Sequence, residues 1–201
     1  MKNIYPEVKM KKEAIYKIFS NMPTLETERF ILRKISMDDT DDMYEYAKNP
    51  NVTTYLTWSP HPDKAYTFEY IAYLQNRYKS GDFFDFAVVC KDTGKMIGTC
   101  GFTRFFFQHD GAEIGYVLNP AYHGKGIATE VVSRIIRYGF ENLGLERLEG
   151  KFIIGNDASR RVMEKNGMIF EGIRRNGMLI KGAYRNVGTC AIIREDFFKK
   201  I

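Results

Sequence analysis

Short blocks of apolar residues recur along the chain with two different periods. Between 126 and 143, apolar residues return every three or four positions, as in Ile127, Val131 and Ile135. This period predicts an amphipathic helix with one buried face. Shorter apolar runs, separated by turn residues, lie at 85–90, 96–105 and 112–118. They predict three strands of an antiparallel meander.

Similar signals predict further elements on both sides of this meander. Ser36, followed three residues later by Asp39, resembles a capping box at the start of a helix, and Gly167 is placed to end one in the left-handed conformation. Helices are expected at 36–48, 63–78 and 158–166, and a loop at 49–62. Strands are expected at 30–33 and 148–154, with two more between 170 and 193. This order predicts an α+β fold, with a βαβα half after the meander.

The first 22 residues are predicted to form an N-terminal helical appendage that ends before Pro23. One apolar helical stripe within it is formed by Ala14, Ile15, Ile18 and Phe19. A chain of 201 residues, 44% hydrophobic and 27% charged, is long enough for one domain with a full core. Residues 23–201 are therefore expected to be that domain.

Composition limits the class of protein. The chain has no run of about 18 apolar residues, which a membrane-spanning helix needs, and its basic N-terminus lacks the apolar core of a signal peptide. Three cysteines, far apart and in apolar stretches, indicate reduced thiols rather than a disulfide framework. These features predict a soluble cytoplasmic protein.

Net charge and metal-ligand residue types select no function by themselves. The net charge of +5 is compatible with nucleic acid, a phosphorylated cofactor or an acidic partner. The chain has no CxxC or HExxH motif, and its histidines, His61, His109 and His123, lie far apart. No metal site is therefore expected.

A glycine-rich stretch at 124–126 lies between the third strand of the meander and the long helix. The first amides of a helix have no intrahelical acceptor and carry the positive end of its dipole, so glycines there let a phosphate oxygen approach. A tight turn is the simpler alternative. The spacing is not that of a P-loop. Thr129 stands where a dinucleotide-binding loop has its third glycine, which argues against an NAD site. Glu146 and Glu149 lie about 20 residues further on, where such a site has an acidic residue, so the NAD alternative stays open.

Four segments, in a consistent order, carry a family resemblance. They are LETERFILR at 25–33, EIGYVLNPAYHGKGIATE at 113–130, NDASRRVMEKNGM at 156–168 and YRNVGTCAIIREDF at 184–197. Together they resemble the GNAT N-acetyltransferases, in the branch of the ribosomal-protein N-terminal-alanine acetyltransferases (RimJ/RimL type). The resemblance covers Leu25 to Phe197. The chain departs from the family pattern at His123, Met168, Asn186 and Cys190.

The resemblance implies a three-layer fold with a mixed, mostly antiparallel central sheet flanked by helices. It also implies an enzyme that transfers the acetyl group of acetyl-CoA to a primary amine, without a metal. The acceptors it implies include a protein N-terminal α-amine such as that of a ribosomal protein. The residues it places at the cofactor are Tyr116, Val117, Leu118, His123, Gly124, Lys125, Gly126, Ile127, Ala128, Thr129, Asn156 and Ser159.

Two residues are candidates for the chemistry. Strand alternation puts Glu113 on the opposite face from Ile114 and Tyr116, which can pack under the helix. The resemblance implies that Glu113 is the general base beside the acceptor, whereas a solvated or ion-paired carboxylate is the alternative. It likewise implies that Ser159 is the general acid. A place in the first turn of a helix capped by Asn156 would explain Ser159 without catalysis.

Trp58, in the expected loop, is the aromatic residue predicted to line the acceptor cleft beside Glu113. At pH 7 an α-amine is about 10 to 20% neutral and a lysine amine only about 0.04%. A site with one weak base therefore suits an α-amine. Two other classes stay open: a noncatalytic CoA-binding or ribosome-associated module, and an NAD-binding protein. A homodimer is compatible with the sequence.

Overall fold

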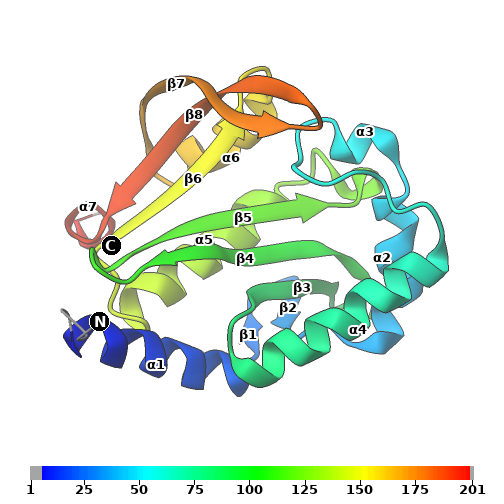
Figure 1. Ribbon diagram of the computed structural model, residues 1–201, viewed down its shortest axis with the longest axis horizontal. Coiled ribbons are helices and arrows are strands. Elements are labelled where there is room, and N and C mark those ends of the chain that lie inside the picture. The colour runs from blue at the N-terminus through cyan, green and yellow to red at the C-terminus, as the bar shows by residue number, and fades with distance from the viewer. Residues whose placement is uncertain (1–5, 200–201) are drawn as a thin grey trace.

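The computed structural model describes residues 6–199 of the 201-residue chain. Its strands form one eight-stranded sheet in the order β1-β2-β3-β4-β5-β6-β8-β7, antiparallel except between β5 and β6 (Figure 1). The strands are β1 (Leu25–Glu26), β2 (Phe30–Arg33), β3 (Phe84–Cys90), β4 (Met96–Phe106), β5 (Gly111–Leu118), β6 (Arg147–Ile153), β7 (Ile169–Ile180) and β8 (Ala183–Ile193). The predicted meander, formed by β3, β4 and β5, is confirmed, and so is the mixed sheet.

Most of the helices lie where the sequence predicted them, but those at 50–53 and 194–198 were not predicted. They are α1 (Pro6–Ser20), α2 (Thr40–Ala47), α3 (Pro50–Thr53), α4 (Lys64–Ser80), α5 (Ile127–Glu141), α6 (Asp157–Lys165) and α7 (Arg194–Phe198). The predicted face of α5 is confirmed, since Ile127, Val131 and Ile135 are all buried. The prediction of a loop at 49–62 is wrong at α3. This single turn forms because the Asn49 side chain caps it by accepting a hydrogen bond from the Asn51 amide.

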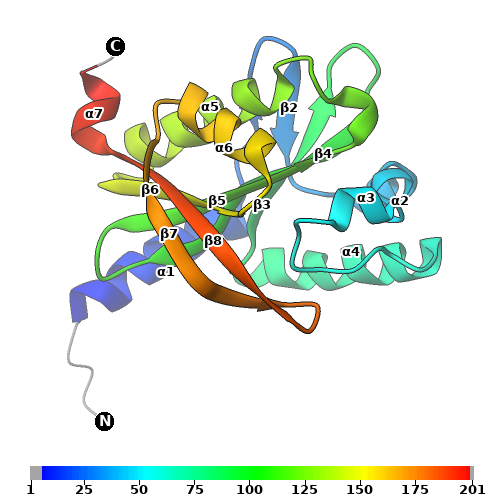
Figure 2. The same ribbon diagram turned by 90° about the horizontal axis from the view of Figure 1, so that it is seen from above.

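Two hydrophobic clusters cover the two faces of the sheet. Phe84 and Phe86 of β3 belong to the cluster that includes residues of α5 and α6, whereas Ala87 and Val89 belong to the cluster with α2 and α4. Figures 1 and 2 show α5 and α6 on one face of the sheet and α2 and α4 on the other. The expected three-layer arrangement is therefore present.

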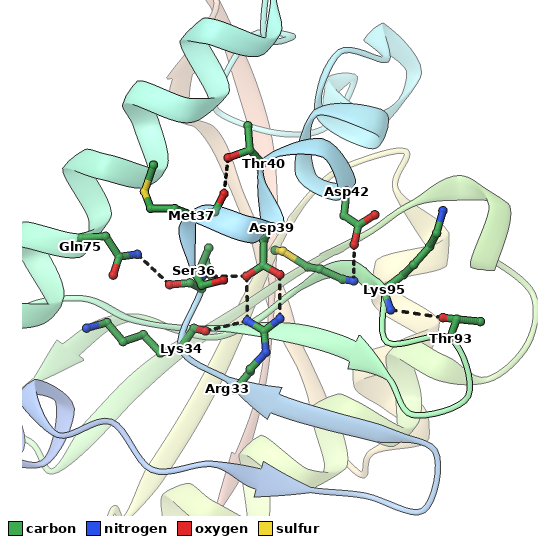
Figure 3. Close-up of polar contacts among 12 residues, drawn as sticks. Arg33, Lys34, Ser36, Met37, Asp39, Thr40, Asp42, Gln75, Thr93 and Lys95 are labelled. Atoms are coloured by element: carbon green, nitrogen blue, oxygen red, sulfur yellow. Dashed lines mark hydrogen bonds and ion pairs between the residues drawn. The ribbon is translucent and has the colours of Figure 1, made fainter.

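A buried ion pair fixes the start of α2 against the sheet. Arg33, at the end of β2, donates two hydrogen bonds of 2.7 Å to the Asp39 carboxylate, whose side chain is only 4% exposed. The same carboxylate accepts from the Ser36 amide at 2.7 Å, as in the predicted capping box (Figure 3). One turn later, Asp42 accepts from the Met96 amide of β4 at 2.8 Å. These bonds tie α2 to both β2 and β4.

The second half of α1 contributes to the main core. Phe19 is fully buried and Ile15 nearly so, whereas Ala14 is exposed. The ring of Phe19 lies 5.0 to 6.1 Å from four other rings, those of Phe84, Phe86, Phe102 and Phe105. The division of the chain at residue 22 stays a prediction, which the variant described below addresses.

The parallel strands β5 and β6 pair over only four residues. Gly111 to Ile114 pair with Arg147 to Gly150, and beyond them β5 has no strand partner on that side in the described chain. β6 continues along β8 as far as Ile153. Figure 1 shows β5 and β6 spreading apart along their length. The splay leaves backbone N–H and C=O groups of residues 115–118 open to a ligand.

We expect Phe19→Ala to lower the free energy of unfolding by about 3 to 5 kcal/mol, because it leaves a cavity among four aromatic rings. Urea unfolding followed by circular dichroism measures the change. Lys17→Ala, at an exposed position on the same helix, is the control and should change the free energy by no more than about 0.5 kcal/mol. Equal effects of the two substitutions would indicate that α1 is separable from the core.

Candidate active site

The splay of β5 and β6 opens into a cleft of about 790 Å³. Its walls come from both strands, from α5 and α6, and from the segment 51–58. The residues expected from the sequence that line it are Trp58, Glu113, Tyr116, Val117, Leu118, His123, Gly124, Gly126, Ile127, Ala128, Thr129, Asn156 and Ser159. Of the expected set, only Lys125 lies outside the lining. The structure therefore brings residues from four separate segments to one cavity.

The glycine loop before α5 has the open backbone that a phosphate needs. Gly124 and Gly126 have φ angles of 77° and 74°, in the left-handed region that glycine adopts without strain. No atom lies within 4 Å of the position that a Cβ at Gly124 would take. The Glu130 amide bonds to the Gly126 carbonyl, and the three amides before it have no acceptor within the helix. With the helix dipole, these free amides are the kind of group that attracts an anion.

The two basic side chains of this loop bond to backbone. His123 Nε2 lies 3.0 Å from the Leu118 carbonyl oxygen, and Lys125 Nζ donates to the Ala121 carbonyl at 3.1 Å. Both contacts brace the turn. The loop amides, and not these two side chains, are therefore the groups left free to contact a phosphate. His123, a departure from the family pattern, thus has a structural partner of its own.

Arg29, which sequence reasoning missed, clamps the loop from outside the cleft. Its guanidinium donates to the Lys125 carbonyl at 3.2 Å and to the Glu130 carboxylate at 2.7 Å, and its amide donates to Glu130 at 3.1 Å. Burial acts to raise the pKa of Glu130, but hydrogen bonds from Thr27 and Arg29 outweigh it and hold the pKa below its ordinary value. The sequence carried no signal for this pair, because its members are 101 residues apart.

Ser159 is placed both to begin α6 and to face the cleft. Its amide donates to Asn156 Oδ1 at 3.2 Å, which caps the helix. Its Oγ lies 3.0 Å from the Tyr116 hydroxyl, which also bonds to the Ser159 carbonyl at 2.9 Å. Burial raises the pKa of Tyr116, so the phenol is protonated at neutral pH. Capping uses the amide of Ser159 and leaves its hydroxyl available for chemistry.

Glu113 lies within a cluster of charges. Lys151 of β6 forms one ion pair with Glu113 and a second, at 3.1 Å, with Glu149. Burial acts to lower the pKa of Lys151, but hydrogen bonds and charge from the two glutamates outweigh it and raise the pKa. Lys151 therefore stays charged beside Glu113. The catalytic role of Glu113 stays a prediction.

Another wall of the cleft is held by contacts between distant segments. Trp58 lines the cleft, with its ring 5.5 Å from that of His61. Lys181, in the turn between β7 and β8, donates a 2.6 Å hydrogen bond to the Thr53 carbonyl of α3. Asn186, a departure from the family pattern, accepts from the Asn176 amide at 2.9 Å. The side chain at 186 thus has a structural contact within the hairpin.

Several polar residues that sequence reasoning did not single out also line the cleft. They are Asp85, Thr99, Thr103, Lys151, Arg161 and Lys165. Asp85 had a visible signal, as a lone carboxylate within the apolar run FFDFAVV. The convergence of these residues had none, because only the sheet brings β3, β4 and β6 together.

Among residues 6–199, no group of three or more His, Cys, Asp or Glu side chains is arranged to hold a metal ion. None of the helices described there is both long enough and apolar enough to cross a membrane. The three cysteines are free thiols.

The chain matches a known family over most of its length. Residues 29–169 match the family model described as an acetyltransferase (GNAT) domain. An uncharacterized N-acetyltransferase, p20, of Bacillus licheniformis is 33% identical over 176 residues, which cover 88% of this chain and 99% of that protein. A crystal structure of a GNAT-family acetyltransferase from Bacillus anthracis is similar with a TM-score of 0.77 at 27% identity, covering 86% of this chain and 99% of that one.

Two other relatives have named acceptors. A spermidine N(1)-acetyltransferase of Vibrio cholerae is 24% identical over 84% of this chain and 95% of that protein. A ribosomal-protein-serine acetyltransferase of Escherichia coli is 30% identical over 49% of this chain and 55% of that protein. These findings favour an acetyltransferase over the NAD-binding alternative.

We expect Gly126→Asp to abolish acetyl-CoA binding in calorimetric titration, because a carboxylate at the start of α5 repels phosphate. Gly126→Asn matches it in size and also tolerates positive φ, so it should bind at least about tenfold more tightly than the aspartate variant. Gly94→Asp is a folding control, at a glycine with φ of 69° and open space around it. Wild-type affinity in Gly126→Asp would show that the loop does not hold the phosphates.

Proposed function

Because the chain belongs to the GNAT acetyltransferase family, we propose that it acetylates the α-amine at the N-terminus of a protein or peptide. The enzyme uses acetyl-CoA, as the acetyltransferases of this family do. A ribosomal protein is the candidate acceptor, because the Escherichia coli relative is a ribosomal-protein-serine acetyltransferase. The observation that carries the choice of an α-amine is the balance of charge along the cleft.

Positive and negative side chains nearly cancel along the cleft lining. Its carboxylates are Asp85 and Glu113, and its cations, apart from histidine, are Lys151, Arg161 and Lys165. Glu113 is already paired with Lys151, so the lining has room for one ammonium group. Spermidine carries several separated ammonium groups, and these would lack partners here. The lining therefore supports a peptide N-terminus over the polyamine of the Vibrio cholerae relative.

The residues present fit acetyl-CoA along its length. The free amides at 127–129 would hold the pyrophosphate, and the open edge of β5 at 115–118 would bond to amides of the pantetheine arm. When bound, acetyl-CoA supplies an activated thioester carbonyl. The chain itself must deliver a neutral amine and a proton for the departing thiolate.

We assign the proton donation to Ser159. Its hydroxyl is bonded to the Tyr116 phenol, which is protonated at neutral pH and donates its own proton to the Ser159 carbonyl, so that the serine is held in place. A thiol of pKa about 8.5 leaves fairly readily as a thiolate, so the donor contributes modestly.

Glu113 is the base predicted from the sequence, and its ion pair bears on that role. Taking a proton would break its contact with Lys151 and leave that ammonium group with Glu149 alone. We therefore propose that Glu113 shapes the acceptor side of the cleft through Lys151. The proton acceptor is then another group in the cleft.

A cytoplasmic location is part of the same proposal, because ribosomal proteins are made and assembled there. Cell fractionation tests it, and enrichment of the protein outside the cytoplasmic fraction would contradict it. The homodimer stays a prediction.

The acceptor proposal is tested with three amines at pH 7. They are a peptide with a free N-terminus, the same peptide with a blocked N-terminus and a free lysine, and spermidine. We expect a kcat/KM for the free α-amine at least about tenfold above the other two, because its neutral fraction is larger. Acetylation of spermidine alone would instead assign a polyamine acceptor. Acetyl-CoA binding with no acetylated amine would favour a noncatalytic module.

Ser159→Ala is expected to slow acetyl transfer in a single turnover by about tenfold to a hundredfold, without abolishing it. Tyr116→Phe removes the hydroxyl that positions Ser159 and should have a smaller effect. Ser133→Ala, at an exposed position of α5, is the control and should leave the rate unchanged. A wild-type rate in Ser159→Ala would remove this serine from the chemistry.

A further inference from the structure

One carboxylate in the cleft has an oxygen without a partner. Asp85 lies on β3 and lines the cleft, and part of the residue is exposed there. Its Oδ1, by contrast, is buried and is the one such side-chain nitrogen or oxygen in the described chain that lacks a hydrogen bond. Buried polar atoms are almost always paired in folded proteins. Oδ1 lies against Gly101, while the exposed part of the residue lines the cleft, so a ligand can supply a further donor to this carboxylate from the cleft side.

The sheet makes room for this carboxylate beside the strand that carries the open edge. Asp85 is paired with Gly101 of β4, and Gly101 is paired with Gly115 of β5. A Cβ at Gly101 would lie 2.9 Å from Asp85 Oδ1. Only a glycine at this position therefore leaves enough space for the carboxylate. Gly115 itself lines the cleft. The row of three residues therefore leads from the carboxylate to the open edge of β5.

The backbone of Asp85 is held by a buried tyrosine. The Tyr78 hydroxyl donates to the Asp85 carbonyl at 2.7 Å and accepts from the Ile35 amide at 3.2 Å. Tyr78 is fully buried between α4 and the sheet. The position of Asp85 is therefore fixed while one carboxylate oxygen stays unused.

The surroundings of Asp85 contain no charge to neutralise it. The titratable groups coupled to it are Tyr46 of α2, Tyr70 and Tyr78 of α4, and Cys100 of β4. Burial raises the pKa of each of these groups, so all four are neutral at pH 7. Burial also raises the pKa of Asp85 to about 7, against hydrogen bonds from Thr99 and the Phe86 backbone. Glu113 differs, because Lys151 lies beside it.

We propose that Asp85 is the proton acceptor of the reaction: it binds the ammonium group of the acceptor amine and takes one proton from it. This inference rests on the proposed function, since it requires an amine that enters the cleft as a cation. A cationic amine supplies the carboxylate with a further donor from the cleft side and with the charge that the surroundings lack. A base whose pKa is near that of an α-amine exchanges a proton with it at little cost.

The proton balance of the step is complete without another reactant. The ammonium group gives one proton to the Asp85 carboxylate, and the neutral nitrogen forms the C–N bond to the thioester carbonyl carbon. The C–S bond breaks as the nitrogen passes its second proton to Ser159, whose own proton goes to the departing thiolate. Asp85 returns its proton to solvent. Each ammonium ion acetylated therefore yields one amide, one CoA thiol and one released proton.

The test is the pH profile of kcat/KM between pH 6 and 9 for wild type, Asp85→Asn and Asp92→Asn, an exposed turn residue. The acceptor is whichever of the free-N-terminus peptide and spermidine the wild type acetylates. The kcat/KM of wild type should give a bell, with an acid limb near pH 7, where Asp85 loses its proton, and an alkaline limb where the amine loses the charge that Asp85 binds. For the peptide, the kcat/KM of Asp85→Asn should fall by about five- to tenfold at pH 7, because only about 10 to 20% of the α-amine is neutral there, and should rise to a plateau as the amine becomes neutral. Asp92→Asn should match wild type.

A peptide hydrazide, whose amine is already neutral at pH 7, separates proton removal from a structural role. Asp85→Asn should keep most of the wild-type rate on the hydrazide and should bind acetyl-CoA with wild-type affinity. An equal loss of rate on hydrazide and ammonium acceptors would overturn the role of Asp85. An unchanged bell-shaped pH profile of kcat/KM in Asp85→Asn would overturn it as well. If that variant does not fold, a wild-type profile that lacks an acid limb near pH 7 overturns it equally.

Failure of the proposed acceptor gives a different pattern. A wild-type enzyme that acetylates spermidine and not the peptide contradicts the α-amine proposal, while the bell and its loss in Asp85→Asn still support the base. A wild-type enzyme that binds acetyl-CoA and acetylates neither amine overturns both proposals.

Discussion

The parallel pairing of β5 with β6 ends after four residue pairs, and the ligand site depends on that end. Beyond those pairs, β6 continues along β8 on its other side as far as Ile153 and no longer pairs with β5. Met163 of α6 packs over Gly150 of β6, where a side chain would collide with its sulfur. The gap exposes an edge of β5 whose backbone groups have no strand to bond to. A ligand that carries amides can complete that edge.

Two carboxylates of the cleft lining show how the surroundings of a side chain decide its chemistry. Glu113 projects from β5 toward a lysine of the neighbouring strand and is held as half of an ion pair. Asp85 projects from β3 among phenols and a thiol, and one of its oxygens has no donor. Burial without a cation disfavours the ionised form, so such a carboxylate can exchange protons near neutral pH. Residue type alone does not separate these two roles.

The two sides of the cleft are built differently. The glycine loop before α5 is built from residues close together in the sequence. Its glycines, the helix start and the backbone carbonyls that brace it all lie within residues 118–130. Arg29 adds the one long-range clamp to it. The acceptor side instead joins α3, the β7–β8 hairpin and the faces of three strands, with Lys181 bonded to Thr53 across 128 residues of sequence. Variation in acceptors can therefore occur without change to the glycine loop that is proposed to hold the phosphates.

The sequence by itself determined most of the helices and strands and indicated the glycine loop. Hydrophobic period, turn residues and caps are local properties, so they located α5, the meander and the glycine loop, and the motifs near 113–130 pointed to the family. The prediction of a loop at 49–62 was wrong at α3. The Asn49 cap starts a helical turn there, in a segment whose polar composition is typical of a loop. The tertiary structure alone decided that Lys151 neutralises Glu113 and that Asp85 is left unpaired in the same cleft. Those environments depend on which strands are neighbours and which glycines leave space between them, and neither is encoded in a local pattern.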